Sequence, residues 1–244
     1  GARMSTCSFK ETEAYSVCGR LGKENKKVLV VASAGNTARA FAQVCSDNNI
    51  KLLLTIPEDT LDALWFEKPL NPCVKVIATK SGSDYFDAIN LGNIACEVEG
   101  FFAEGGAKNI ARRDGMATTM LSATTFIGRI PDYYFQAVGS GTGAIAAWEA
   151  NLRFIEDGRF GDHKAKIYVS QNRPFVPMYD AWKQDSREML PYDNDQARLD
   201  ANSVIAKVLT NRKPPYSIAG GLYDAMKDSD GDFFAVTNEE AEQA

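Results

Sequence analysis

Short apolar segments alternate with longer amphipathic segments along most of the 244-residue chain. The apolar segments have the length of strands and lie at residues 28–32, 52–56, 74–78, 101–103, 133–138 and 167–170. Helical periodicity falls at residues 37–46, 84–98, 109–128 and 142–156. Strands that alternate with helices of this length form βαβ units, whose right-handed crossovers place the helices on the faces of a parallel sheet. The sequence therefore predicts an α/β fold with ligands bound beyond the carboxyl ends of its strands.

The composition excludes several classes of protein. Hydrophobic residues make up 45% and charged residues 24% of the chain, which is ordinary for a folded domain and unlike a disordered one. The formal net charge is −5 without a long basic block, whereas a nucleic-acid-binding protein needs a basic surplus. No apolar segment approaches the roughly 18 residues that span a bilayer. We therefore expect neither a nucleic acid nor a membrane as a partner.

The use of cysteine and histidine narrows the chemistry further. The five cysteines are widely spaced and form no CxxC pair, which favours free thiols and a cytoplasmic location over disulfides or a zinc site. The single histidine, His163, lies in a predicted loop, where an exposed position is expected. A histidine-based catalytic triad and a multi-histidine metal centre are thus excluded, and we expect no metal.

Lys10 follows a pattern that is typical of a helix start. Ser8 and Glu11 have the spacing of a capping box, which predicts a helix that begins at Ser8. Lys10 then lies in the first turn, where the positive end of the helix dipole disfavours an ammonium group. An amine that loses its proton easily suits a Schiff-base lysine. Because capping boxes are common, however, this motif alone favours an ordinary surface lysine.

The glycine-rich sequence GSGTG, at residues 139–143, lies between a predicted strand and a predicted helix. Gly139, Gly141 and Gly143 allow the backbone to approach an anion closely, and the following helix presents unpaired N–H groups. The hydroxyl groups of Ser140 and Thr142 can add donors. We predict a phosphate site here rather than a merely tight turn. A dinucleotide site is disfavoured, because the next predicted strand ends in SQN without the acidic residue that holds a ribose.

The sequence SAGNT, at residues 33–37, forms another turn between a predicted strand and a predicted helix. Asn36 can donate and accept hydrogen bonds at once, and the N–H groups of such a turn can bind a carboxylate. The alternative is an asparagine that caps the helix. The turn alone does not decide between the two.

In this order, the lysine, the asparagine turn and the glycine-rich loop resemble the fold type II, tryptophan synthase β-like, family of pyridoxal-phosphate enzymes. The resemblance implies two α/β lobes with mostly parallel sheets, and pyridoxal 5′-phosphate as the cofactor. It also implies that Lys10 is the catalytic residue, which binds the cofactor as a Schiff base, and that Asn36 contacts the cofactor ring. The cofactor phosphate would bind to Gly139, Ser140, Gly141, Thr142 and Gly143. The substrate carboxylate would bind to Ser33, Gly35 and Thr37.

Longer stretches resemble the cysteate synthases among threonine synthase-like enzymes. They are CSFKE at 7–11, GGAKNIARRDGM at 105–116, QAVGSGTG at 136–143, NRPFVPMY at 172–179, NRKPPYS at 211–217 and GGLYDA at 220–225. Threonine synthases usually have Asp and Arg after the lysine, whereas Glu11 and Thr12 follow it here. The resemblance implies a transferase that makes L-cysteate and phosphate from O-phospho-L-serine and sulfite, on a route to coenzyme M.

Both of these substrates are anions, so we expect cationic side chains near them. The basic cluster at residues 108–113 lies at a predicted helix start, and Arg112 is its first candidate for substrate binding; the alternative is a solvated basic face. Three other functions stay open. They are a threonine synthase acting on O-phosphohomoserine, a nicotinamide-dependent oxidoreductase, and a non-catalytic relative that binds a phosphate or an amino acid.

The resemblance also predicts the organisation of the chain. Residues 27–105 would form a small lobe that carries the Asn36 turn. Residues 1–26 and 106–244 would form a large lobe that carries Lys10 and the glycine-rich loop. The first ten residues and the last six suggest a fragment that lacks both ends of the family's chain. Relatives are commonly dimers, so a homo-oligomer is expected.

Overall fold

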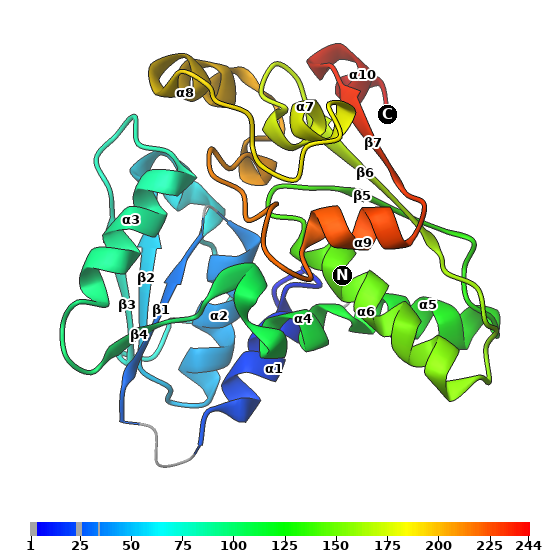
Figure 1. The fold of residues 1–244 in the computed structure, drawn as a ribbon. Coiled ribbons are helices and arrows are strands. Elements are labelled where there is room, and N and C mark those ends of the chain that lie inside the picture. The colour runs from blue at the N-terminus through cyan, green and yellow to red at the C-terminus, as the bar shows by residue number, and fades with distance from the viewer. Residues whose placement is uncertain (1–3, 23–25, 34) are drawn as a thin grey trace. The chain divides into compact units, whose positions relative to one another are not determined.

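The computed structural model describes residues 4–22, 26–33 and 35–244. The chain divides into two compact units, residues 1–115 and residues 116–244. Each unit has its own sheet, and every strand pair in both sheets is parallel (Figure 1). The predicted α/β class with parallel sheets is therefore confirmed.

The first unit contains a four-stranded sheet in the order β3-β2-β1-β4. Its strands are β1 (Val28–Ala32), β2 (Leu52–Ile56), β3 (Val74–Ala78) and β4 (Phe101–Ala103). Its α-helices are α1 (Glu11–Arg20), α2 (Asn36–Asp47), α3 (Tyr85–Ala95) and α4 (Ile110–Met116). Short 3₁₀ helices, η1 and η2, lie at Glu58–Ala63 and Gly106–Lys108.

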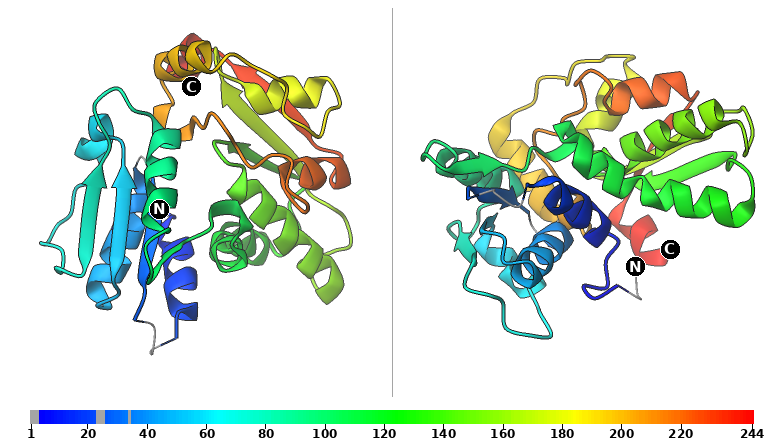
Figure 2. Two further views of the ribbon diagram at one scale, coloured as in Figure 1. Left: turned by 60° about the vertical axis from the view of Figure 1, so that its left-hand side comes forward. Right: turned by 90° about the horizontal axis from the view of Figure 1, so that it is seen from below.

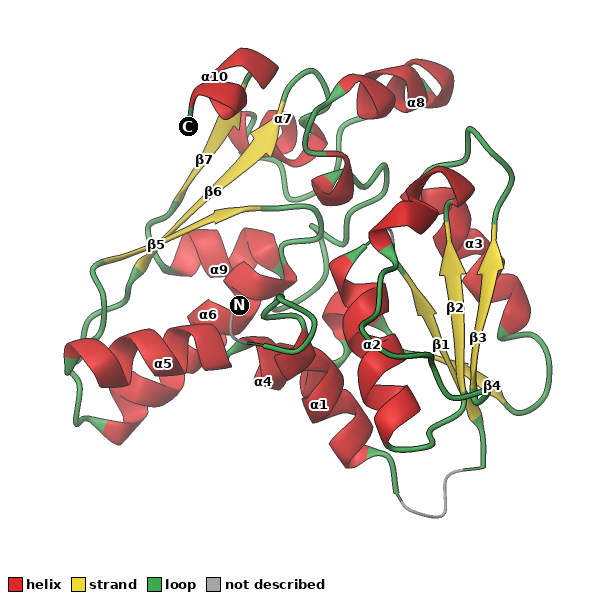
Figure 3. Cartoon of the chain, turned by 180° about the vertical axis from the view of Figure 1, so that it is seen from behind, coloured by secondary structure: helices red, strands yellow, loops and turns green. Residues whose placement is uncertain are grey.

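Helices cover both faces of this sheet. Successive side chains of a strand point to opposite faces, so the apolar strands place hydrophobic side chains on both. Leu29 and Val31 of β1 join a buried apolar cluster with α2 and α1. Val30 points the other way, where α3 approaches closely at Gly92. Figures 1 and 3 show α2 and α3 on these opposite faces, and α1 packs against α2. Burial on both faces explains why β1 and β2 are almost entirely apolar. The one polar residue, Thr55 of β2, is buried, and its hydroxyl donates to the carbonyl of Ala88 at 2.8 Å.

The second unit contains a three-stranded sheet in the order β5-β6-β7. Its strands are β5 (Tyr133–Ala137), β6 (Lys166–Asn172) and β7 (Asp232–Val236). Its α-helices are α5 (Thr118–Ile127), α6 (Thr142–Asp157), α7 (Pro177–Lys183), α8 (Asn194–Ser203), α9 (Leu222–Asp228) and α10 (Asn238–Gln243), and η3 lies at Lys207–Leu209. Helix α6 packs against α5, α9 and two strands of the sheet, and Figure 2 shows α5 and α6 side by side.

The strands of the second sheet alternate between a buried and a more exposed face. On β6, Ile167, Val169 and Gln171 are buried, and the residues between them are only partly so. Tyr168, on the second face, contacts the rings of Phe135 and Phe234, which are well exposed in this chain. This sheet thus has one apolar interior face and one aromatic face that the described residues leave open.

Four predicted strands, 28–32, 52–56, 74–78 and 101–103, have the predicted bounds. The helix expected over residues 109–128 is two helices, α4 and α5, which meet at Ala117.

The predicted lobes differ from the two compact units at residues 1–26 and 106–115. Helix α1 groups with the first sheet because it packs on α2. As units of motion, the lobes stay a prediction.

Candidate active site

Lys10 does not lie in the first turn of a helix. It immediately precedes α1, which begins at Glu11, so the predicted helix start at Ser8 is wrong. The Ser8 hydroxyl accepts a hydrogen bond from the Lys10 N–H at 3.2 Å, while the Glu11 carboxylate accepts from both the N–H and the hydroxyl of Thr6. The hydroxyl of Ser5 also donates to Glu11, at 3.0 Å. Glu11 therefore closes a turn with residues before Ser8 and takes no part in a capping box.

The surroundings of Lys10 favour the loss of its proton. Burial lowers the pKa of Lys10; the carboxylate of Glu13 opposes this effect, and the guanidinium of Arg112 adds to it. The pKa of Lys10 is shifted downward, as predicted, but the main cause is burial and not the helix dipole. The Lys10 side chain is 23% exposed, and its Nζ lies 3.9 Å from the Oε2 of Glu13. Part of the Lys10 side chain thus remains accessible.

Arg112 is held in a buried ionic network with Glu13 and Glu104. Its Nε and Nη2 donate to the two oxygens of Glu13 at 3.0 and 3.2 Å, and its Nη1 donates to the Oε2 of Glu104 at 2.7 Å. The Thr37 hydroxyl donates to the Oε1 of Glu13 at 2.8 Å. Burial lowers the pKa of Arg112, but the two carboxylates outweigh it and raise the pKa overall. The network therefore holds Arg112 firmly in its charged form.

The turn after β1 is organised by side chains. The Ser33 hydroxyl accepts from the N–H groups of Gly35 and Ala38 at 3.2 and 3.0 Å. Asn36 does not cap α2; its side chain is exposed, and its Oδ1 accepts from the Nη1 of Arg39 at 3.3 Å. Ser33 thus provides the cap of α2, and the exposed Asn36 contacts Arg39. Ala34, which belongs to the predicted turn, lies outside the described residues.

The turn after β5 is organised by its glycines. Gly141 precedes the first residue of α6 and has a φ of 77°, a conformation that side chains disfavour. A Cβ atom at this position would lie 2.8 Å from the side chain of Leu222. The hydroxyls of Ser140 and Thr142 lie 2.8 Å apart at the same turn. The first N–H groups of an α-helix have no acceptor within it, so this turn offers backbone donors; the N–H of Thr142 donates to the Ser140 hydroxyl at 3.4 Å.

The predicted site residues fall into two sets. Lys10, Ser33, Gly35, Asn36, Thr37 and Arg112 belong to the first unit. Gly139, Ser140, Gly141, Thr142 and Gly143 belong to the second unit. Within the first set, the network of Glu13 connects Thr37, Arg112 and Lys10. Both sets lie at the carboxyl ends of parallel strands or beside them, where α/β folds bind ligands.

Comparison with known protein families decides what this arrangement represents. A profile described as "Pyridoxal-phosphate dependent enzyme" matches residues 2–244. The chain belongs to this family.

Individual relatives agree with this assignment. The cysteate synthase of Methanosarcina barkeri is 49% identical over 245 residues, which cover 100% of this chain and 59% of that protein. The cysteate synthase of Methanosarcina acetivorans is 48% identical, covering 99% of this chain and 58% of that protein. The chain thus spans about three fifths of the length of the curated relatives it matches.

Solved structures of other enzymes resemble the chain as well. Serine racemase from Dictyostelium discoideum matches with a TM-score of 0.66 and 16% identity, over 100% of this chain and 70% of that one. Threonine deaminase isoform 2 from Solanum lycopersicum matches with a TM-score of 0.68 and 17% identity, over 98% of this chain and 63% of that one. At such identities the likeness concerns the fold alone, and it confirms the predicted fold type II.

The residues present fit the cofactor of this pyridoxal-phosphate family. The cofactor needs an amine that is neutral often enough to react with its aldehyde, and burial lowers the pKa of Lys10. It also needs a phosphate site, and the turn at 139–143 offers helix N–H groups and two hydroxyls. At Gly143, a Cβ atom would meet the Gln136 side chain at 2.7 Å, so a glycine keeps the first turn of α6 free of bulk.

Three residues near Lys10 and Asn36 were not predicted from the sequence. They are Glu13, Glu104 and Arg39, all buried and all charged. The only local signal was the spacing of Lys10 and Glu13, three residues apart, which places two side chains on one side of a helical turn. Glu104 and Arg39 lie outside the predicted motifs, although each has a partner nearby in the sequence: Glu104 accepts from Arg112, and Arg39 donates to Asn36.

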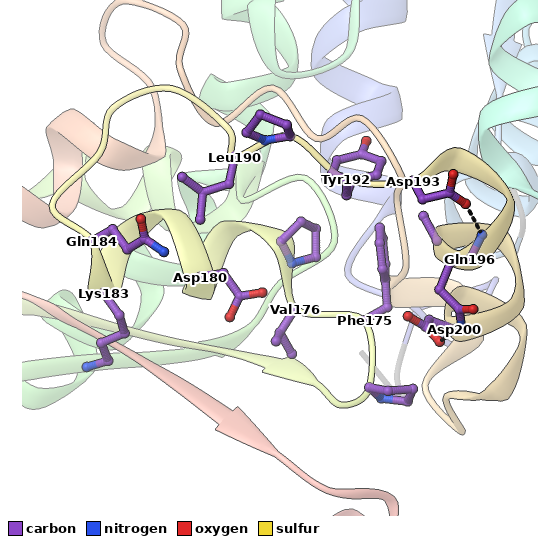
Figure 4. A pocket seen from close by; sticks show the side chains of 14 residues that line it. Phe175, Val176, Asp180, Lys183, Gln184, Leu190, Tyr192, Asp193, Gln196 and Asp200 are labelled. Carbon is purple, nitrogen blue, oxygen red and sulfur yellow. Dashed lines mark hydrogen bonds between the residues drawn. The ribbon is translucent and has the colours of Figure 1, made fainter.

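A separate pocket of about 440 Å³ lies in the second unit. Figure 4 shows Asp180 and Lys183 of α7, with Gln184 directly after that helix, on one side of it and Phe175 and Tyr192 on another. None of the predicted site residues lines it.

Among the described residues there is no group of three metal-ligating side chains, and no helix long and apolar enough to cross a membrane.

Proposed function

We propose that this protein catalyses a pyridoxal-phosphate-dependent β-replacement, in which O-phospho-L-serine and sulfite give L-cysteate and phosphate. The observation that carries the proposal is the similarity to cysteate synthases, which is 46–49% in identity along nearly all of this chain in eight relatives. The amine of Lys10, whose pKa burial lowers, supports it.

In this proposal, Lys10 has two tasks. Its Nζ would hold the cofactor, and as a free, neutral amine it would take the proton from the substrate Cα. Bound pyridoxal phosphate supplies an electron sink for the charge that remains on that carbon. The lowered pKa of Lys10 suits both tasks, because each begins with the neutral amine.

The two turns would hold the other charged groups. The turn at 139–143 would bind the cofactor phosphate through its helix N–H groups, with Ser140 and Thr142 as additional donors. The exposed side chain of Asn36 would contact the cofactor ring. The turn at 33–37 would bind the substrate carboxylate through backbone N–H groups at the start of α2, since the hydroxyls of Ser33 and Thr37 and the N–H of Gly35 already have partners.

Substrate binding by Arg112 stays a prediction, and its contacts favour another role. Its guanidinium donates hydrogen bonds to Glu13, Glu104 and Thr37, and the side chain is 9% exposed. An anionic substrate would have to displace at least one of these buried partners. The cytoplasmic location and a homo-oligomeric state also stay predictions.

The experiment measures product formation with purified protein and added pyridoxal phosphate. With O-phospho-L-serine, sulfite should be converted to cysteate, and one phosphate should be released for each cysteate. With O-phosphohomoserine and no sulfite, threonine should form slowly or not at all. Threonine production that sulfite does not affect would contradict the proposal and favour a threonine synthase.

Paired lysine variants test the assignment of the residue. Lys10→Ala should abolish cysteate formation, whereas Lys51→Ala should leave it unchanged, because Lys51 is exposed and directly precedes β2. Equal activity of the two variants would show that Lys10 is not the catalytic amine.

A further inference from the structure

Glu13 is the most deeply buried ionisable residue beside Lys10. It is 0% exposed, and Glu104, Arg112 and Thr37 around it are 7%, 8% and 8% exposed. Its Oε1 accepts from Thr37 and from the Nη2 of Arg112. Its Oε2 accepts from the Nε of Arg112 and faces the Nζ of Lys10. Each oxygen of this carboxylate is therefore fixed in place.

The charges of this network do not cancel without Lys10. With both carboxylates ionised, Glu13 and Glu104 contribute two negative charges and Arg112 contributes one positive charge. One negative charge remains in a region from which water is largely excluded, and such a charge is costly to bury unless it is paired. The ammonium group of Lys10 supplies the missing positive charge. The network is therefore neutral when Lys10 holds a proton and negative when it does not.

We propose that Glu13 is a positioning residue for Lys10, which holds the amine and stabilises the proton that it takes from the substrate. The inference rests on the proposed function for the identity of that proton, but the pairing itself follows from the geometry. Arg112 and Thr37 act through Glu13, because they fix the direction in which its carboxylate points. Arg112 is then needed for the position of the base rather than for contact with substrate.

Two opposing influences make this pairing useful for proton transfer. Burial lowers the pKa of Lys10, which supplies a neutral amine, and Glu13 limits the decrease, which allows the amine to keep a proton. Without Glu13, the protonated amine would be a buried cation beside the cation of Arg112. A base in that situation would release its proton too readily to hold it between two steps.

Other charged groups also face Lys10 or its partners. Glu104, directly after β4, raises the pKa of Lys10, and Arg112 of α4 lowers it. Tyr85, at the start of α3, lies near Arg112, and burial raises the pKa of its hydroxyl. Among the described residues, Glu13 is the carboxylate that forms an ion pair with Lys10, so it should have the largest effect.

The test measures the pKa of Lys10 in the whole chain without cofactor. Reductive ¹³C-methylation makes each lysine visible by NMR, and the Lys10 signal is identified by its absence in Lys10→Arg. In Glu13→Gln, the pKa of Lys10 should fall by roughly 1 pH unit or more, the usual effect of an opposite charge within about 4–6 Å. Glu11→Gln is the matched control: it removes a buried carboxylate from the same turn, but Glu11 is not among the groups that shift Lys10.

A second variant covers the case in which Glu13→Gln does not fold. Glu13→Asp keeps the charge and withdraws it by one methylene group, so it should lower the pKa of Lys10 by a smaller amount. An unchanged pKa in whichever of these variants folds would overturn the inference.

Adding pyridoxal phosphate separates this inference from the proposed function. The pH at which the visible absorbance of the bound cofactor changes should fall in Glu13→Gln and not in Glu11→Gln. If the cofactor never attaches to Lys10, the proposed function fails, while the pairing of Glu13 with Lys10 is still judged by NMR. If it attaches but Glu13→Gln moves neither reading, this inference alone fails.

Discussion

Two turns of the molecule begin in the same way and achieve their shape by opposite means. Each follows a parallel strand and leads into a helix, β1 into α2 and β5 into α6. The turn after β1 is held by side chains, with Ser33 as the cap and Thr37 bound to Glu13. The turn after β5 is shaped by glycines, which bring the backbone close to Leu209 and Leu222.

This difference matches what each turn would bind. A phosphate can be held by backbone N–H groups alone, so a turn without bulky side chains suffices for it. A carboxylate, a cofactor ring and a reactive amine need donors and acceptors with a defined direction. The turn after β1 and its neighbours provide that direction through a network that is anchored by buried charges.

Removal of Arg112 should have the largest effect on stability, because it breaks the ionic network with Glu13 and Glu104 that anchors the turn after β1. Arg112→Ala leaves the carboxylates of Glu13 and Glu104 buried without their partner, which should cost about 3–5 kcal/mol of unfolding free energy. Arg113→Ala, at the next position, should cost no more than about 1 kcal/mol. Urea denaturation of both variants provides the comparison. Equal losses would mean that the network does not stabilise the first unit.

The second turn should be sensitive at Gly141 for a reason unrelated to the cofactor. Gly141→Ala combines a positive φ with a contact to Leu222, and the conformation alone should cost about 1–2 kcal/mol. Gly158→Ala is the matched control, since Gly158 has a φ of 76° and open space around it. Thermal unfolding without cofactor should show a greater loss for Gly141→Ala. If the losses are equal, Leu222 does not constrain the turn.

The smallest expected effects on stability are in the turn after β1, where they distinguish Ser33 as a helix cap from Asn36 as a ligand-binding residue. Ser33→Ala should cost about 1 kcal/mol of stability through the lost helix cap. Asn36→Ala should change stability by less than about 0.5 kcal/mol, because its side chain is exposed, but it should weaken the retention of pyridoxal phosphate. Denaturation and equilibrium dialysis measure the two quantities. If Asn36→Ala lowers stability and leaves cofactor retention unchanged, Asn36 is a structural residue and does not contact the cofactor.

Local patterns in the sequence predicted much of the fold. The strands β1, β2, β3 and β4 were found because apolar runs of strand length end at turn residues. The helices α7, α8 and α9 were not predicted, since they lie in a stretch without clear periodicity. The helix start at Ser8 was wrong because Glu11 binds Thr6, a competition that spacing alone does not reveal.

The candidate site was predicted in its local parts only. Lys10, Asn36 and the turn at 139–143 each belong to a motif that is contiguous in the sequence. The network of Glu13, Glu104 and Arg112 joins three separate elements, so no local pattern could predict it. Substrate binding by Arg112 stays a prediction, and its partners Glu13 and Glu104 became known only from the fold.

The most direct test of the account is to identify the lysine that binds the cofactor. The protein is incubated with pyridoxal phosphate, reduced with borohydride, digested and analysed by mass spectrometry. The account predicts a visible absorbance band before reduction and a single modified lysine, Lys10, after it. Modification of a different lysine, or a band that persists in Lys10→Ala, would contradict the central claim.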